Sequence, residues 1–251
     1  MGKKVLITGI KRVGKAIAKS LIEKGYDLCL LYRSSEKEVR DLERFGASLG
    51  RKVVPLKADL SDPSSYTSVV SRAYEELGGI DAFIHLASPY FSTPVEKLSR
   101  EDLYSHFVPI AEAFLFLSKL IYERMLGNND KVKGRIVAFG DWAVECTPYK
   151  RYSAYFVAKG ALHTAVKVLA KEFAPHVLVN CIALGPTLKA EELSDEEWER
   201  ILKKTPLQRA VSLDDVISLT RFLLECDSIT GEIIRVDGGR HIAGSGTGSV
   251  G

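Results

Sequence analysis

Tyr155 and Lys159 are the side chains whose types and spacing most directly indicate chemistry. They stand four residues apart, so on a helix both would project from one face. A phenol with the usual pKa of about 10 is a poor acid–base catalyst near neutral pH, but a neighbouring ammonium ion favours the phenolate. The pair therefore predicts an acid–base centre if its surroundings form a binding site, because the same pattern is common on solvated helices.

The turn after the first predicted strand carries two glycines. Residues 8–18 have the sequence TGIKRVGKAIA, in which Gly9 and Gly14 frame the turn and an amphipathic helix follows directly. Glycine lets the backbone approach a pyrophosphate, and the start of the helix offers free N–H groups and a positive dipole end. A tight strand–helix bend explains two glycines equally well. Further sequence features are therefore needed before this turn can be interpreted as a nucleotide-binding site.

The end of the second predicted strand provides such a feature. An NAD site usually has an acidic residue here, which binds the ribose 2′-hydroxyl, but this chain has Arg33, Ser34 and Ser35. A guanidinium and two hydroxyls suit a 2′-phosphate instead, so we expect NADPH as the cofactor in preference to NADH. An exposed arginine beside a helix cap is the alternative explanation. Asp59 and Leu60, just after the third predicted strand, are placed to hold the adenine.

The elements that must position these residues follow a regular alternation. Short aliphatic runs alternate with segments of helical period, which predicts a parallel sheet with helices on both faces. One helix is expected from about Arg100 to Tyr122, and no linker or repeat interrupts the first 240 residues. We expect one domain over residues 1–241 and a flexible Gly/Ser-rich tail over residues 242–251. The predicted strands lie near residues 3–8, 27–32, 52–57, 81–86, 134–139, 176–183 and 232–236.

Composition narrows the class of partner. With 35 basic and 32 acidic side chains the net charge is only +3, which does not favour a nucleic-acid or membrane partner. The four cysteines and five histidines lack metal-ligand spacing, so no metal site is expected. No signal peptide or membrane-spanning run is recognisable, which predicts a cytoplasmic protein with a small-molecule substrate. The scarcity of Gln, Asn and Met is typical of a thermophilic source.

Over about residues 3–241 the chain resembles the short-chain dehydrogenase/reductase family. The shared features are the glycine turn, Asp59-Leu60, residues 86–88 (LAS), the Tyr155/Lys159 pair, residues 179–187 (VNCIALGPT) and residues 229–239 (ITGEIIRVDGG). The resemblance implies one Rossmann-fold domain with a seven-stranded parallel doubly wound sheet, hydride transfer from a nicotinamide cofactor, and a homodimer or homotetramer. The implied cofactor-binding residues are Gly9, Lys11, Arg12, Val13, Gly14, Arg33, Ser34, Ser35, Asp59, Leu60, Ala87, Ser88, Tyr155, Lys159, Gly185, Pro186 and Thr187.

Within that family the details are most similar to the pteridine reductases and dihydromonapterin reductases. The similarity rests on residues 11–14 (KRVG), on Arg33-Ser34, and on residues 87–94 (ASPYFSTP). It also rests on Asp141 at the end of the fifth strand, where the wider family has a serine that hydrogen-bonds a substrate carbonyl. The substrate-binding residues expected from these segments are Ser88, Tyr90, Phe91, Asp141 and Trp142.

The exchange of serine for Asp141 has a physical meaning. An ionised carboxylate only accepts hydrogen bonds and would repel a developing alkoxide, whereas it suits the N–H groups of an amino-oxo pteridine. A protonated Asp141 would instead donate alongside Tyr155. Tyr90, Phe91 and Trp142 are candidates for stacking on a flat heterocycle, although packing at the mouth of the site would account for them equally well.

Three positions depart from the family pattern. The glycine turn is one residue shorter, residues 85–88 (HLAS) replace Asn-Asn-Ala-Gly, and Pro109 stands where the family has an Asn that anchors a proton-relay water. Pro109 should kink its helix and free the carbonyl of Ser105, which we expect to keep a relay water near Lys159. His85, at the end of a buried strand, is more consistent with a packed core histidine than with a catalytic one.

The leading interpretation is an NADPH-dependent oxidoreductase that transfers hydride to the C=N bond of a dihydropterin or similar heterocycle. Tyr155 would be the acid, Lys159 would tune it and Asp141 would orient the substrate. One alternative is a carbonyl reductase for a 3-oxoacyl thioester, a sugar or another ketone, and Asp141 argues against it. The other is a non-catalytic NADP-binding sensor or scaffold, which Pro109 favours and the intact Tyr155/Lys159 pair opposes.

Overall fold

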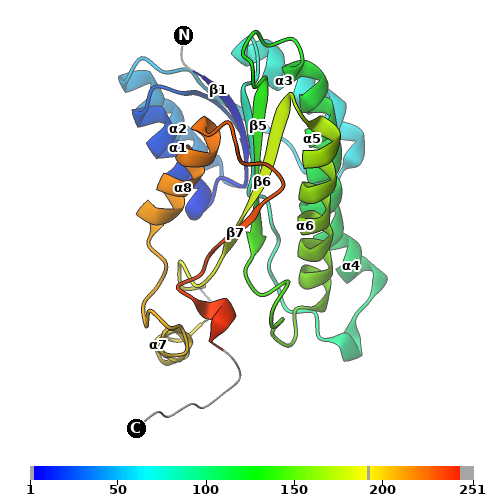
Figure 1. The fold of residues 1–251 in the computed structure, drawn as a ribbon, viewed down its shortest axis with the longest axis vertical. Coiled ribbons are helices and arrows are strands. Elements are labelled where there is room, and N and C mark those ends of the chain that lie inside the picture. The colour runs from blue at the N-terminus through cyan, green and yellow to red at the C-terminus, as the bar shows by residue number, and fades with distance from the viewer. Residues whose placement is uncertain (1–2, 191–192, 244–251) are drawn as a thin grey trace.

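A computed structural model describes residues 3–190 and 193–243 of the chain. Seven strands form one parallel sheet in the order β3-β2-β1-β4-β5-β6-β7 (Figure 1). This confirms the predicted seven-stranded parallel sheet, and each strand ends within two residues of its expected bounds. The strands are β1 (Lys4–Thr8), β2 (Asp27–Tyr32), β3 (Val53–Lys57), β4 (Ala82–His85), β5 (Gly134–Asp141), β6 (Val177–Leu184) and β7 (Ile233–Val236).

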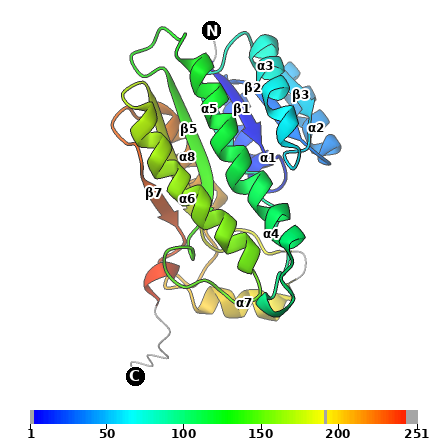
Figure 2. The same cartoon turned by 90° about the vertical axis from the view of Figure 1, so that its right-hand side faces the viewer.

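Helices cover both faces of the sheet, as the alternation predicted. Figures 1 and 2 show α1 (Val13–Glu23), α2 (Glu36–Ser48) and α8 (Leu213–Glu225) on one face. The opposite face carries α3 (Tyr66–Leu77), α4 (Arg100–Phe107), α5 (Ala113–Met125) and α6 (Ser153–Phe173), while α7 (Asp195–Lys203) lies beyond the carboxyl ends of the strands. Short 3₁₀ turns occur at Pro63–Ser65, Val95–Lys97 and Arg240–Ile242.

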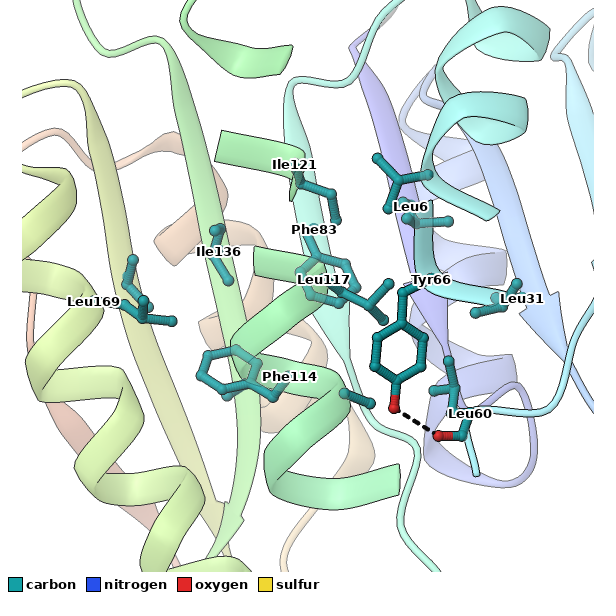
Figure 3. Close-up of a cluster of buried hydrophobic side chains, with 14 of the residues drawn as sticks. Leu6, Leu31, Leu60, Tyr66, Phe83, Phe114, Leu117, Ile121, Ile136 and Leu169 are labelled. Atoms are coloured by element: carbon teal, nitrogen blue, oxygen red, sulfur yellow. Dashed lines mark hydrogen bonds between the residues drawn. The ribbon is translucent and has the colours of Figure 1, made fainter. Parts of the chain in front are cut away.

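Alternation along the strands divides the core into two layers. In β1, Val5 and Ile7 pack towards α1 and α8, whereas Leu6 between them packs towards α3 and α5. This follows from the pleat, which points successive side chains to opposite faces. The second layer is drawn in Figure 3, where the ring of Tyr66 lies among aliphatic side chains and its hydroxyl donates to the Leu60 carbonyl at 2.8 Å.

The predicted helix over residues 100–122 is present but is not uniform. A π-helical turn, Val108–Glu112, separates α4 from α5 and contains Pro109, and the N–H of Ala113 donates to the carbonyl of Val108. Proline has no N–H to donate, so the backbone changes its hydrogen-bond register there. The kink expected at Pro109 therefore takes the form of a π-helical turn. The free carbonyl of Ser105, with a relay water near Lys159, stays a prediction.

Among the described residues, no helix is long and apolar enough to cross a membrane. The tail predicted over residues 242–251 lies outside the described residues, apart from Ile242 and Ala243.

Candidate active site

The carboxyl ends of the central strands meet at a cavity of about 800 Å³. It lies where the chain connections leave β1 and β4 in opposite directions, which is the usual ligand position in open parallel sheets. Every residue predicted to hold cofactor or substrate lines this cavity, with the exception of Phe91. The Phe91 ring packs on His106, with ring centroids 4.1 Å apart, which agrees with the packing alternative, while a stacking role of Phe91 stays a prediction.

The glycine turn has the close backbone approach that its sequence predicted. Gly9 has a φ of +78°, and a Cβ there would lie 2.5 Å from the carbonyl carbon of Leu86. Only glycine fits such a position without rearrangement. The N–H of Gly14 donates to the carbonyl of Lys11 at 3.0 Å, and Arg12 adopts a φ of 51°. The shortened turn is thus closed by a non-glycine residue in a conformation that L-residues seldom adopt.

The side chain of Arg12 links this turn to the segment before α7. Its Nη2 donates to the carbonyls of Leu188 and Lys189 at 2.6 and 2.9 Å. The segment that precedes α7 therefore closes one side of the cavity, next to Gly185, Pro186 and Thr187. Among these, Thr187 is buried and its hydroxyl donates to the Gly185 carbonyl at 3.0 Å.

The predicted 2′-phosphate site contains an exposed arginine beside an exposed carboxylate. Arg33 Nη1 lies 3.8 Å from Asp59 Oδ2, and both side chains are largely accessible to solvent. Such a surface pair contributes little free energy, so the guanidinium can turn towards a phosphate. Ser35 precedes α2 and makes no side-chain capping bond, which leaves its hydroxyl available to a ligand.

Ser88 supplies an independent sign that a ligand completes this cavity. Its hydroxyl oxygen is buried at the cavity wall and has no hydrogen-bond partner among the described residues. Buried polar atoms are nearly always paired, so an orphaned hydroxyl at a cavity indicates a missing polar group. With the glycine turn, Arg33 and Ser35, the donor set fits a dinucleotide that carries an extra phosphate.

The acid–base pair lies at the centre of the site. Helix α6 presents Tyr155 and Lys159 on one face, and the phenol hydroxyl donates to Asp141 Oδ2 at 3.0 Å. Lys159 Nζ donates to the Phe139 carbonyl at 2.6 Å and lies 5.7 Å from the centroid of the Tyr155 ring. β5 pairs with β6 as far as Asp141, which is opposite Leu184, and this pairing fixes the carboxylate beside the tyrosine.

Burial governs the protonation of these three groups. It raises the pKa of Tyr155 well above its usual value, and the neighbouring Asp141 carboxylate adds to the rise. Without a bound ligand, burial and Asp141 therefore favour the protonated phenol, and the effect of Lys159 together with an oxidised nicotinamide on the phenolate stays a prediction. Burial also raises the pKa of Asp141, against hydrogen bonds from the Ala143 N–H and from Tyr155, and lowers the pKa of Lys159 to about 8.

Sequence reasoning missed two residues that shape the site. Tyr149 donates to Asp141 Oδ2 at 3.3 Å and receives a hydrogen bond of 3.3 Å from Tyr90. Arg240 lies over the ring of Trp142, with its guanidinium carbon 5.6 Å from the centroid. Tyr149 lies in an irregular segment and Arg240 begins a short 3₁₀ turn. Only the three-residue spacing of Tyr149 from Tyr152 and of Tyr152 from Tyr155 could have indicated the first.

His85 is a packed histidine, as the sequence favoured. Its Nδ1 lies 3.0 Å from the hydroxyl of Thr8 and its Nε2 lies 3.1 Å from the carbonyl of Ile110. Burial, with Lys159 nearby, lowers the pKa of His85 to about 3, so the ring is neutral near pH 7.

Comparison with known proteins adds to this geometry. A family model described as enoyl-(acyl carrier protein) reductase matches residues 9–241. The dihydromonapterin reductase of Citrobacter koseri is 29% identical over 240 residues, which cover 95% of this chain and 96% of that protein. The crystal structure of FolM alternative dihydrofolate reductase 1 from Brucella suis in complex with NADP has a TM-score of 0.91 and 30% identity, covering 98% of this chain and 97% of that one. Its counterpart from Brucella canis, complexed with NADP, has a TM-score of 0.89 and 29% identity, covering 99% of this chain and 98% of that one.

Proposed function

The chain belongs to the short-chain dehydrogenase/reductase family, and on that premise we propose that it reduces a C=N bond of a dihydropterin or a similar heterocycle with NADPH. The observation that carries this proposal is the hydrogen bond between Tyr155 and Asp141 at the end of β5. A carboxyl group in contact with the proton donor suits a nitrogen heterocycle, because it can accept from N–H groups or donate to a ring nitrogen.

NADPH is the proposed cofactor. The Brucella structures described above were solved with NADP, and this chain offers possible donors to such a cofactor in the glycine turn and at Arg33, Ser35 and Ser88. When bound, the cofactor supplies the hydride. The protein supplies the second half of the reduction, which is a proton for the substrate nitrogen.

Tyr155 is proposed to give that proton. Its raised pKa keeps the phenol protonated at neutral pH, so that it can act as a general acid without prior activation. Lys159 stabilises the phenolate that forms, because its ammonium lies near the Tyr155 ring and its position is fixed by the Phe139 carbonyl. Asp141 orients the heterocycle, and its raised pKa allows it to hold a proton beside Tyr155.

The alternatives differ in what Asp141 does. For a simple ketone, an ionised Asp141 would oppose the charge that develops on the substrate oxygen, and a hydroxyl would serve better. A non-catalytic sensor would not need the buried Tyr155, Lys159 and Asp141 to be arranged around one another. The arrangement of these three side chains supports catalysis, and the presence of an aspartate at position 141 supports a heterocyclic substrate.

One experiment tests the proposal. NADPH oxidation is followed spectrophotometrically with dihydropterins and with a panel of ketones, for the wild type, Tyr155→Phe and Asp141→Ser, with Tyr122→Phe as a matched control remote from the cavity. We expect pterin turnover in the wild type and in Tyr122→Phe, and a loss of about 100-fold or more in kcat for Tyr155→Phe and Asp141→Ser. Turnover of ketones alone, or cofactor binding without any turnover, would refute it.

A further inference from the structure

Four side chains form a continuous hydrogen-bonded line between the rim of the cavity and the buried acid. The hydroxyl of Tyr90 donates to that of Tyr149 at 3.3 Å, and Tyr149 donates to Asp141 Oδ2 at 3.3 Å. The same carboxylate oxygen accepts from Tyr155 at 3.0 Å. Tyr90 is 42% exposed, whereas Tyr155 is only 6% exposed, so the line runs from solvent to the interior.

The reaction proposed above requires such a connection, and the present inference rests on that proposed function. Each reduction removes one proton from Tyr155, and the phenol must be protonated again before the next turnover. Pro109, which also lines the cavity, has a side chain that can neither donate nor accept a hydrogen bond. Lys159, on the other side of Tyr155, donates to the carbonyl of Phe139.

We propose that Tyr149 and Tyr90 form a proton relay that returns a proton from solvent to Tyr155 through Asp141. Tyr155 gives its proton to the substrate nitrogen and becomes a phenolate. The Asp141 carboxylate takes the proton that Tyr149 donates and passes it to that phenolate, and Tyr90 restores the proton on Tyr149. Water restores the proton on Tyr90, so that one proton enters from solvent for each proton that leaves with the product.

The aromatic packing holds the relay hydroxyls in place. The ring of Tyr90 is stacked on Tyr152 with centroids 4.6 Å apart and planes 16° apart. The ring of Tyr149 meets Tyr152 and Phe156 edge-on, at 5.4 and 4.6 Å. These contacts restrict the rings, so each hydroxyl stays within reach of the next group, while the hydrogen atom itself can rotate from one partner to the other.

Charge and burial are consistent with transfer along this line. Burial and the Asp141 carboxylate raise the pKa of Tyr149, and burial raises the pKa of Tyr90, so both hydroxyls are protonated near neutral pH and can donate. Burial likewise raises the pKa of Asp141, so this carboxylate accepts a transferred proton more readily than an exposed one would. The titratable groups facing the carboxylate are Tyr149 and Tyr155, with the ammonium of Lys159 nearby.

The test removes one hydroxyl and supplies a substitute proton donor. Tyr149→Phe keeps the ring and its packing, and Tyr122→Phe is the matched control, because Tyr122 is stacked on Phe173 away from the cavity. In dilute buffer of low proton-donating capacity, we expect Tyr149→Phe to lower kcat about tenfold or more, with KM for the substrate changed less than about twofold. Added imidazole, a small diffusible proton donor, should restore kcat in Tyr149→Phe and leave the wild type and Tyr122→Phe unchanged.

Tyr90→Phe provides a second variant at the exposed end of the line, and the same loss and rescue are expected for it. Unchanged kcat in both variants would overturn the relay, and so would a loss that imidazole does not restore, because a purely structural defect cannot be repaired by a buffer. The comparison uses whichever substrate the wild type reduces, since a ketone also needs a proton. Turnover of ketones alone would therefore refute the pterin proposal but still test the relay, and no turnover at all would overturn both.

Discussion

Asp141 and Lys159 are two buried titratable groups beside Tyr155, one accepting the hydrogen bond of the phenol and the other lying 5.7 Å from its ring centroid. The carboxylate is 8% exposed and the lysine 3% exposed, so each loses most of its hydration. Loss of hydration favours the neutral form of each group, which raises the pKa of the acid and lowers that of the base. The two groups thus shift towards the pH range in which an enzyme works, and this is common at catalytic sites.

The lowered pKa of Lys159 predicts the alkaline limit of activity. Because the ammonium form stabilises the Tyr155 phenolate, activity should be present below the pKa of about 8 and lost as the pH rises through it. The profile of kcat/KM against pH should therefore fall above about pH 8 in the wild type. Lys159→Arg keeps its charge, so its remaining activity should not fall in that range. A fall at the same pH in Lys159→Arg would contradict the assignment.

Sequence spacing located the acid–base residues better than it located the residues around them. Tyr155 and Lys159 could be paired because helical period fixes their common face, and Asp141 could be placed because it ends a strand. Tyr149 and Phe91 lie in irregular segments, where the direction of a side chain is set by tertiary packing and not by a period. Tyr149 was overlooked for that reason, and Phe91 does not line the cavity where it was expected.

At the scale of elements, the sequence around Pro109 predicts that the helix is interrupted but not the geometry of the interruption. The missing N–H of proline predicts that α-helical bonding is interrupted, and the interruption is found. The sequence does not reveal whether the backbone at Pro109 bends sharply or changes its hydrogen-bond register, because packing against α6 and the sheet decides between these two geometries. The strands were easier to predict, since buried parallel strands are nearly continuous apolar runs.

The close approach of α6 to β5 depends on Gly140. A Cβ at this position would lie 2.1 Å from His163 Nε2 and 2.7 Å from Cys181 Sγ, and both side chains are buried. Because both side chains are packed in the interior, such overlap would force them or the backbone around them to shift. The glycine therefore sets the distance between the helix that carries Tyr155 and the strand that ends in Asp141.

Gly140→Ala should accordingly destabilise the protein by about 1–3 kcal/mol. The free energy of unfolding is measured by denaturant titration, with Gly160→Ala as the matched control. At Gly160, on the same helix as Tyr155, an added Cβ would meet only Val144 Cγ1 at 3.9 Å, so alanine should be neutral or stabilising by up to about 1 kcal/mol. Adding His163→Ala to Gly140→Ala should recover part of the loss. Equal stability of Gly140→Ala and the wild type would contradict the contact.

The described part of the chain buries three histidines that its acid–base chemistry does not use, namely His85, His106 and His163. His85 lies under the glycine turn with both ring nitrogens hydrogen-bonded, whereas neither ring nitrogen of His163 has a hydrogen-bond partner within the described part of the chain. Glu145 lies 3.7 Å from His163 Nδ1 but also binds Lys167 and Arg235. The neutral form of His163 is therefore favoured by the fold, and its protonation opposes folding.

This arrangement predicts how the stability of the whole protein depends on pH. Burial lowers the pKa of His163 from 6.5 to about 4, so the unfolded chain binds a proton more tightly than the folded protein does. The resulting contribution is fully present above about pH 6.5 and is lost as the pH falls towards 4, by an amount on the order of 2–3 kcal/mol. His163→Leu removes this group, so its free energy of unfolding should fall less between pH 7 and pH 4.5 than that of the wild type. The comparison is made within each protein, because any change in packing caused by leucine is the same at both pH values. Equal losses in the two proteins would show that His163 is not protonated on unfolding in this range.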